Sequence, residues 1–299
     1  MQILKGKSVL VTGGSGFIGT NLIARLLKEG ADVLNISLNP PQLEVSTIID
    51  DLRTSTFSFL DQDFDYVIHL AALSNNRLCE DLEVAFDTNV SATIRLLEAL
   101  KNRPVKKIIF ESSIVLYAKD APIPLTESSP TDIHHDNYTF TKGLAEQITH
   151  YMGKKLPILT LRLGNVFGPH QDWRIAPNII PQIMTQALTN KKIELLNPTA
   201  IRDFIFVQDV VNAIMLGMIS EARGVFNCAS GIGTSVGNLA NEVAQLTGSS
   251  VIGSNQPIWG PSQVACDITK IKQTLSWKPQ TSLKHGLEQT LAYYQAVLL

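Results

Sequence analysis

A glycine-rich segment near the N-terminus constrains the fold of this chain more than any other feature. Residues 9–19 have the sequence VLVTGGSGFIG, an apolar run that breaks into glycines and is followed by the amphipathic stretch 20–29. This order predicts a strand, a tight turn and a helix, which is the setting of a dinucleotide-binding turn. Gly13 permits the turn, and Gly19 allows the helix to pack closely on the strand.

The start of this predicted helix is suited to an anion. Gly16 has no side chain, so the backbone N–H groups of the first helical residues, Phe17 and Ile18, can approach a pyrophosphate. We therefore expect the segment from Gly13 to Gly19 to bind a dinucleotide cofactor.

Strand-like and helix-like runs alternate through the N-terminal half. Such alternation predicts a parallel sheet with right-handed crossovers and helices on both faces, so residues 1–168 are assigned to a Rossmann-like, doubly wound α/β domain. Beyond it the pieces are shorter, and residues 169–299 are predicted to form a smaller mixed α/β lobe that covers substrate. A helix at 208–221 is expected to pack back on the sheet and so interleave the two. The other expected helices lie near 17–29, 79–101, 136–153, 177–190 and 236–247, and the expected strands near 7–12, 32–37, 45–49, 66–70, 106–112 and 157–163.

Composition excludes several classes of protein. The chain has 299 residues, of which 44% are hydrophobic, enough for one large or two small cores. No window approaches 18 consecutive apolar residues and the first strand begins almost at once, so we expect no membrane span, no signal peptide and a cytoplasmic location. A net charge of −2 without a basic cluster argues against nucleic acid as a partner. The three cysteines are expected to be buried and reduced, and the six histidines show no metal-ligand spacing, so no metal is predicted.

A tyrosine and a lysine four residues apart, Tyr138 and Lys142, indicate chemistry. On a helix this spacing places both side chains on one face, where the ammonium can lower the pKa of the phenol and hold a nearby ribose. Upstream, an apolar run ends in Ser112 and Ser113, and ligands of an open α/β sheet lie beyond the carboxyl ends of the strands. The order of glycine-rich turn, serine, tyrosine and lysine predicts an oxidoreductase site with the phenol as acid or base.

Together these motifs resemble the extended short-chain dehydrogenase/reductase family, the NAD-dependent epimerase/dehydratase group that modifies nucleotide sugars. The resemblance runs nearly end to end, and its motifs occur in the family's order. They are T-G-x-x-G-x-x-G at 12–19, H-L-A-A at 69–72, S-S-x-x-V-Y-G at 112–118 with Leu116 and Ala118 departing from it, Y-x-x-x-K at 138–142, R-x-x-N-V-Y-G-P at 162–169 and R-D-[FY]-[IV]-x-V-x-D at 202–209.

The resemblance implies roles for the matching residues. Tyr138 would exchange the proton on the reacting sugar oxygen, Ser113 would bond and polarise that oxygen, and Lys142 would anchor the nicotinamide ribose. Arg202 is expected to bind the nucleotide diphosphate of the sugar substrate, because a guanidinium matches phosphate oxygens. Further cofactor contacts are implied at Asp51, Leu52, Leu70, Ala71 and Ala72, and further substrate contacts at Ser74, Ser113, Asn165 and Asn178.

The end of the second predicted strand bears on the choice of cofactor. Ser37 stands where an acid, about 20 residues past the glycines, would bind the adenosine ribose and repel a 2′-phosphate. A hydroxyl tolerates the phosphate and Asn39 can contact either form. The sequence therefore favours NADP over NAD, although no arginine or lysine follows closely.

Absences next to the active serine narrow the reaction. The family's 4,6-dehydratases and decarboxylases carry acids there, and its epimerising reductases carry a cysteine, whereas this chain has Ile114 and Val115. Chemistry at one carbon remains, either a 4-keto-6-deoxysugar reductase or a 4-epimerase resembling UDP-glucose 4-epimerase with tightly bound NAD. Gly260 replaces the arginine of the family's R-P-G-D segment, which removes one expected diphosphate contact and, with Ser37, favours the reductase.

Two other hypotheses and one assembly follow from the same residues. A dinucleotide-binding sensor without turnover is disfavoured, because serine, tyrosine and lysine are all retained. A reductase of a non-sugar carbonyl is disfavoured by Arg202 and the R-x-x-N-V segment. In this family, helices such as those at 79–101 and 136–153 pair with their copies across a twofold axis, so a homodimer is expected.

Overall fold

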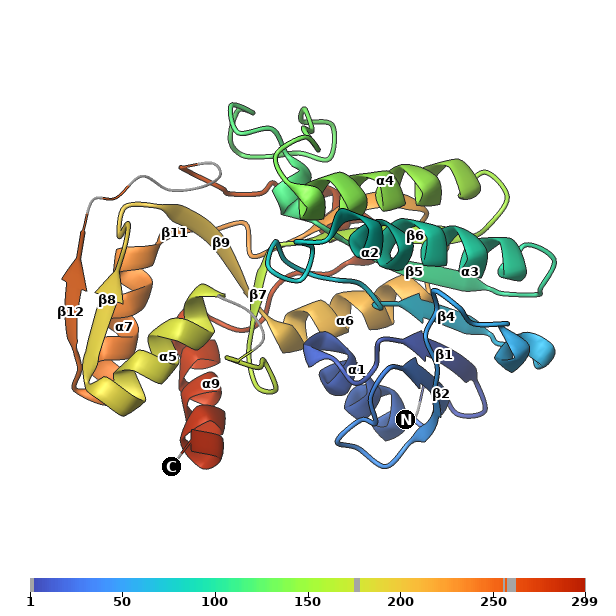
Figure 1. Cartoon of the computed structure of the whole chain (residues 1–299), viewed down its shortest axis with the longest axis horizontal. Helices are drawn as coiled ribbons and strands as arrows, with labels where there is room; N and C mark the ends of the chain where they lie inside the picture. The colour runs from blue at the N-terminus through green and yellow to red at the C-terminus, as the bar shows by residue number, and fades with distance from the viewer. Residues whose placement is uncertain (1–2, 175–177, 255, 257–261, 299) are drawn as a thin grey trace. The chain divides into compact units, whose positions relative to one another are not determined.

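The computed structural model describes residues 3–174, 178–254, 256 and 262–298. Its largest sheet has seven strands, which are β1 (Ser8–Thr12), β2 (Asp32–Ser37), β3 (Ser46–Ile49), β4 (Tyr66–His69), β5 (Lys107–Ser113), β6 (Ile158–Leu163) and β10 (Gly224–Cys228). They lie in the order β3-β2-β1-β4-β5-β6-β10, and the pairs β1–β2, β2–β3, β1–β4 and β4–β5 are parallel (Figure 1). The strand order reverses between β1 and β4, which is the switch point at which such sheets bind ligands. The Rossmann-like doubly wound fold predicted from the sequence is confirmed.

Helices cover both faces of this sheet. On one face lie α1 (Phe17–Lys28) and α6 (Val207–Met218), and on the other lie α2 (Leu82–Phe86), α3 (Ala92–Leu100) and α4 (Asn137–Met152) (Figure 1). Every residue of β4 and β6 is buried, as expected for parallel strands covered on both sides. A Cβ at Gly217 would lie 3.3 Å from Ile109 Cδ1, so α6 packs directly on β5 at this point.

Contacts divide the chain into two compact units. The first comprises residues 1–116, 132–162 and 211–226, and the second comprises residues 117–131, 163–210 and 227–299. Serine, tyrosine and lysine of the predicted site all belong to the first unit.

The helix predicted at 79–101 differs in detail. It begins later, because the side chain of Asp81 caps α2 by accepting a hydrogen bond from Val84 N at 3.1 Å. Between α2 and α3, residues Asp87–Ser91 form a π-helical turn. Such turns inside helices are frequent at functional sites, and this one contains Asn89.

The second unit has its own sheets and apolar core. Its strands are β7 (Asn165–Phe167), β9 (Ile201–Phe206) and β11 (Gly233–Ser235) in one sheet and β8 (Lys192–Leu195) and β12 (Ser250–Gly253) in another. Its helices are α5 (Ile179–Asn190), α7 (Val236–Thr247), α8 (Thr269–Leu275) and α9 (Leu283–Leu298). The core joins apolar side chains of α5, α7 and α9, among them Ile183, Met184, Leu239, Val243, Leu287 and Tyr294.

Three further observations concern the cysteines, groups of metal-binding side chains and the length of apolar helices. Cys79, Cys228 and Cys266 are buried and free, as predicted. Among the described residues, His, Cys, Asp and Glu side chains form no group of three or more that could hold a metal ion. Across the same ranges, no helix is both long enough and apolar enough to cross a bilayer.

Exposed apolar side chains on α2, α3 and α4 suit the expected dimer. Leu82 and Tyr151 are 45% and 66% exposed, and Val84, Phe86 and Ile94 are also exposed. We expect the wild-type chain to sediment as a dimer at micromolar concentration, and the variant Leu82→Glu/Tyr151→Glu to sediment as a monomer, because two buried charges would oppose pairing. The control Ile219→Glu changes an exposed residue elsewhere and should leave the dimer intact. A wild-type monomer would contradict the expected assembly.

Candidate active site

The predicted catalytic side chains come from the end of β5 and the first turns of α4. Ser113 is the last residue of β5, and Tyr138 and Lys142 lie on the buried face of α4. Their exposed fractions are 9%, 8% and 2%. A capping box fixes the start of α4, since Asp136 Oδ1 accepts from Thr139 N at 2.8 Å and the Thr139 hydroxyl accepts from Asp136 N at 3.2 Å.

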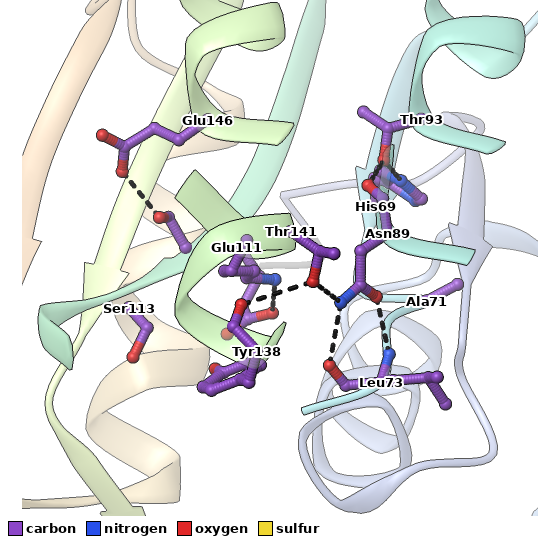
Figure 2. Close-up of polar contacts among 12 residues, drawn as sticks. His69, Ala71, Leu73, Asn89, Thr93, Glu111, Ser113, Tyr138, Thr141 and Glu146 are labelled. Atoms are coloured by element: carbon purple, nitrogen blue, oxygen red, sulfur yellow. Dashed lines mark hydrogen bonds and ion pairs between the residues drawn. The ribbon is translucent and has the colours of Figure 1, made fainter. Parts of the chain in front are cut away.

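A buried ion pair fixes α4 one turn beyond Lys142. Arg162 Nη2 donates to Glu146 Oε1 at 2.5 Å, and the Ser112 hydroxyl donates to Glu146 Oε2 at 2.6 Å. Arg162 and Ser112 belong to β6 and β5, so these bonds join the helix to two strands. They hold α4 in one position along the two strands, and Tyr138 then lies near Ser113 at the end of β5 (Figure 2).

Asn89 ties the loop after β4 to α4, which was not predicted from the sequence. Its side chain accepts a hydrogen bond from Leu73 N at 2.8 Å and donates to Leu73 O at 3.1 Å and to Thr141 Oγ1 at 3.0 Å (Figure 2). Thr141 precedes Lys142 in α4. The signal for Asn89 was a polar residue on the buried face of a helix, one turn from Ala85 and from Thr93.

Glu111 pairs with Lys142, and this contact was also missed. Lys142 Nζ donates to Glu111 Oε2 at 2.6 Å (Figure 2). The same nitrogen lies 5.1 Å from the centre of the Phe110 ring. The side chains of Lys142 and Glu111 are 2% and 15% exposed. The available signal was a single acid between the apolar residues 108–110 and two serines.

The surroundings of Tyr138 favour its neutral form. Burial raises the pKa of the phenol far above its usual value, and the Glu111 carboxylate raises it further, while a hydrogen bond with Ser113 acts in the opposite direction. The sequence predicted that Lys142 lowers this pKa. In the structure the ammonium is paired with Glu111. The pKa of the phenol is raised instead of lowered, mainly by burial.

The glycine turn has the shape of a dinucleotide cradle. Gly13 has φ +74°, and a Cβ there would lie 2.7 Å from Ala71 N. A Cβ at Gly19 would lie 2.5 Å from Gly14 Cα. Because Gly16 caps α1 without a side chain, the first N–H groups of the helix face outward and fit the pyrophosphate of a nicotinamide dinucleotide.

Strand β4 brings the predicted residues 70–72 to this turn. Leu70 N donates to Thr12 O at 3.1 Å. His69 lies between two hydroxyl groups. The Thr12 hydroxyl is 2.7 Å from His69 Nδ1, and the Thr93 hydroxyl is 2.9 Å from His69 Nε2. Burial lowers the pKa of His69 to about 3, so this side chain is a neutral structural link. The predicted substrate residue Ser74 follows in the loop and is exposed.

The Ser37 hydroxyl is hydrogen-bonded within the protein, next to the glycine turn. It is 7% exposed, accepts a hydrogen bond from Ser15 N at 3.2 Å and donates to Asn35 Oδ1 at 3.2 Å. Asn35 Oδ1 also accepts from Gly14 N at 3.0 Å. Both hydrogen-bonding roles of the Ser37 hydroxyl are therefore used inside the protein, whereas Asn39, two residues on, is exposed.

Asp51 forms a local turn. Its carboxylate accepts from Arg53 N at 2.9 Å and pairs with Arg53 Nη2 at 2.6 Å. Hydrogen bonding by Arg53 lowers the pKa of this carboxyl below its usual value. Asp51 and the buried Leu52 remain predicted contacts for the adenine.

The predicted substrate residues Asn165 and Arg202 lie on neighbouring strands of the second unit. Asn165 in β7 is in register with Phe204 in β9, two residues after Arg202, so the two side chains share a face of that sheet. In the described part of the chain Arg202 has no acidic partner, and burial lowers the pKa of its guanidinium. Asn178 is the exposed N-cap residue of α5. Gly260 lies outside the described residues.

Comparison with known proteins relates the whole chain to nucleotide-sugar enzymes. Residues 9–229 match the NAD dependent epimerase/dehydratase family. A UDP-glucose 4-epimerase from Lactobacillus helveticus is 28% identical over 305 aligned positions, covering 91% of this chain and 92% of that protein. Two solved structures are similar. The UDP-N-acetylglucosamine 4-epimerase from Methanobrevibacter ruminantium M1 in complex with UDP-N-acetylmuramic acid has a TM-score of 0.91 and 28% identity, covering 98% of this chain and 100% of that one. The UDP-glucuronic acid 4-epimerase from Bacillus cereus in complex with UDP-glucuronic acid and NAD has a TM-score of 0.87 and 26% identity, covering 97% and 99%.

The ion pair beneath the site predicts a large stability effect. Arg162→Met should lower the free energy of unfolding by about 3–5 kcal/mol, because it leaves the Glu146 carboxylate buried without a countercharge. Adding Glu146→Gln removes that charge and keeps an acceptor for Ser112, so the double variant should be more stable than Arg162→Met alone. Urea unfolding followed by circular dichroism measures both. A double variant no more stable than the single one would contradict this account.

Proposed function

We propose that this chain, which belongs to the NAD dependent epimerase/dehydratase family, is a nucleotide-sugar 4-epimerase that uses NAD. The observation that carries the proposal is the buried set of Ser113, Tyr138 and Lys142 beyond β5, with apolar side chains at Ile114 and Val115. Such a set can move one proton at one oxygen, and the two residues that follow Ser113 offer no group for eliminating water. The relatives named above include 4-epimerases of three UDP-sugars.

The chain's own residues have distinct tasks in this reaction. When bound, NAD supplies the group that takes a hydride from the sugar carbon and returns it. The N–H groups of Phe17 and Ile18 bind the pyrophosphate, and Lys142 orients the nicotinamide ribose. Tyr138 Oη accepts the proton of the sugar 4-hydroxyl and later returns it, while Ser113 bonds to the same oxygen.

Arg202 is proposed to bind the diphosphate of the substrate. Burial disfavours a guanidinium without a countercharge, so a phosphate group that pairs with it restores the lost stabilisation. Asn165, on the same face of that sheet, is proposed as a further contact to the substrate, and the exposed Asn178 as another.

NAD is preferred here over NADP, and the epimerase over the reductase. Ser37 favours NADP only if its hydroxyl is free to meet the cofactor, and in the structure this hydroxyl is hydrogen-bonded to Ser15 and Asn35. The B. cereus relative was solved with NAD. Without the NADP argument, the reductase rests on Gly260 alone.

The reaction can be tested directly on the purified chain. Incubation with UDP-glucose, UDP-N-acetylglucosamine or UDP-glucuronic acid and NAD should produce the 4-epimer of at least one sugar, detected by proton NMR, without net change in NADH absorbance. Dinucleotide released by denaturation should be NAD. Stoichiometric consumption of NADPH with a 4-keto-sugar, and no epimer from any of these substrates, would replace the proposal with the reductase.

Removing the phenol should stop turnover while leaving cofactor binding. Tyr138→Phe is expected to lower kcat by on the order of a hundredfold or more, because proton transfer at the sugar oxygen is lost. NAD affinity, measured by calorimetry, should change only a few fold, since the ring itself is retained. Near-normal turnover in this variant would rule out Tyr138 as the acid–base group.

A further inference from the structure

The contact between Glu111 and Lys142 gives the site a third ionisable member. Lys142 Nζ and Glu111 Oε2 are 2.6 Å apart, and the lysine side chain is almost completely buried. In such surroundings an ammonium is stable only with a close countercharge. The Lys142 ammonium is therefore paired within the site, and its partner Glu111 lies on β5, the strand that ends at Ser113.

We propose that Glu111 is a positioning residue: its carboxylate fixes the Lys142 ammonium beside the end of β5 and offsets the positive charge that Lys142 would otherwise present to the Tyr138 phenol. The group acts through Lys142 and through the field at the phenol. Its meaning for turnover rests on the proposed function, but its effect on Tyr138 does not.

The other groups around the phenol cannot replace Glu111. His69 on β4, which faces Lys142, is neutral because burial lowers its pKa to about 3. Cys79, before α2, is a neutral thiol because burial raises its pKa. Asp136, the N-cap of α4, is the other nearby acid, and its effect on the pKa of Tyr138 is smaller than that of Glu111.

The charges at neutral pH then explain the protonated phenol. Glu111 and Lys142 together contribute no net charge, so the ammonium does little to stabilise a tyrosinate, and burial keeps Tyr138 neutral. If the carboxylate is removed, its repulsion of a tyrosinate is lost and Lys142, one helical turn from Tyr138, keeps an unpaired ammonium. A tyrosinate beside an unpaired ammonium is favoured, so the phenol should lose its proton at a lower pH.

The test follows the ionisation of Tyr138 in the full-length, substrate-free protein. Tyrosine labelled with ¹³C at Cζ reports each phenol by NMR, and Tyr138→Phe assigns the signal. In Glu111→Gln the titration midpoint of Tyr138 should fall by about one to three pH units relative to wild type, the size expected for one charge within a few ångströms. Glutamine keeps the size of the side chain and an acceptor for Lys142, and thermal unfolding checks that the variant is folded.

Two matched variants separate charge from shape. Glu111→Asp keeps the charge and should keep Tyr138 protonated over nearly the same pH range as wild type. Glu98→Gln makes the same chemical change on the surface of α3, where Glu98 pairs with Lys101, and should leave the midpoint unchanged. An unchanged Tyr138 signal in Glu111→Gln, including one that never titrates, or an equal shift in Glu111→Asp, would overturn the proposal.

A second measurement connects the residue to turnover. If epimerisation is observed, the acidic limb of the pH–rate profile of Glu111→Gln should move to lower pH, because the base form of Tyr138 becomes available earlier. Absence of epimerisation in wild type would refute the proposed function and leave the NMR result standing. An NMR shift without movement of the acidic limb would overturn the part of the proposal that concerns turnover.

Discussion

The attachment of α4 to the sheet is the interaction on which the candidate site depends. Two buried acid–base pairs form this attachment, Glu111 with Lys142 and Glu146 with Arg162, one helical turn apart. Charges this deeply buried are costly unless each has its partner in good geometry. The pairs therefore favour one register of the helix, and in that register Tyr138 lies beside Ser113. The capping box at Asp136 serves the same register from the other end.

Local patterns in the sequence were sufficient to predict the fold, and the residues that they single out as catalytic lie near one another at the end of β5 and the start of α4. Near-continuous apolar runs predicted β4 and β6 because both faces of these strands are covered. Gly13 and Gly19 predicted the turn because neighbouring backbone leaves no room for a Cβ. The helix spacing of Tyr138 and Lys142 predicted a shared face. In each case the signal is a short pattern in the sequence, although the backbone that excludes a Cβ at Gly13 is that of Ala71.

The sequence was less informative where a side chain has two possible partners. Ser37 occupies the position of a ribose contact, yet its hydroxyl is satisfied by Ser15 and Asn35, and nothing in the order of residues favours one partner over the other. The spacing of Tyr138 and Lys142 also predicted a lowered pKa for the phenol, whereas the pKa is raised, mainly because the phenol is buried and further because Glu111 lies nearby on β5. The surroundings of each side chain in the folded protein decide such cases.

Similarity to epimerases does not fix the pH at which the candidate site works, because that pH depends on the charges around Tyr138 in this chain. In the proposed reaction Ser113, Tyr138 and Lys142 would supply the proton path, and the charges around the phenol would set the pH at which that path operates. With Glu111 next to Lys142, the resting site holds a neutral phenol and an internally compensated ammonium. A cationic nicotinamide entering such a site would add the charge that favours the tyrosinate. In the proposed reaction, ionisation of Tyr138 would then be linked to the binding of oxidised cofactor.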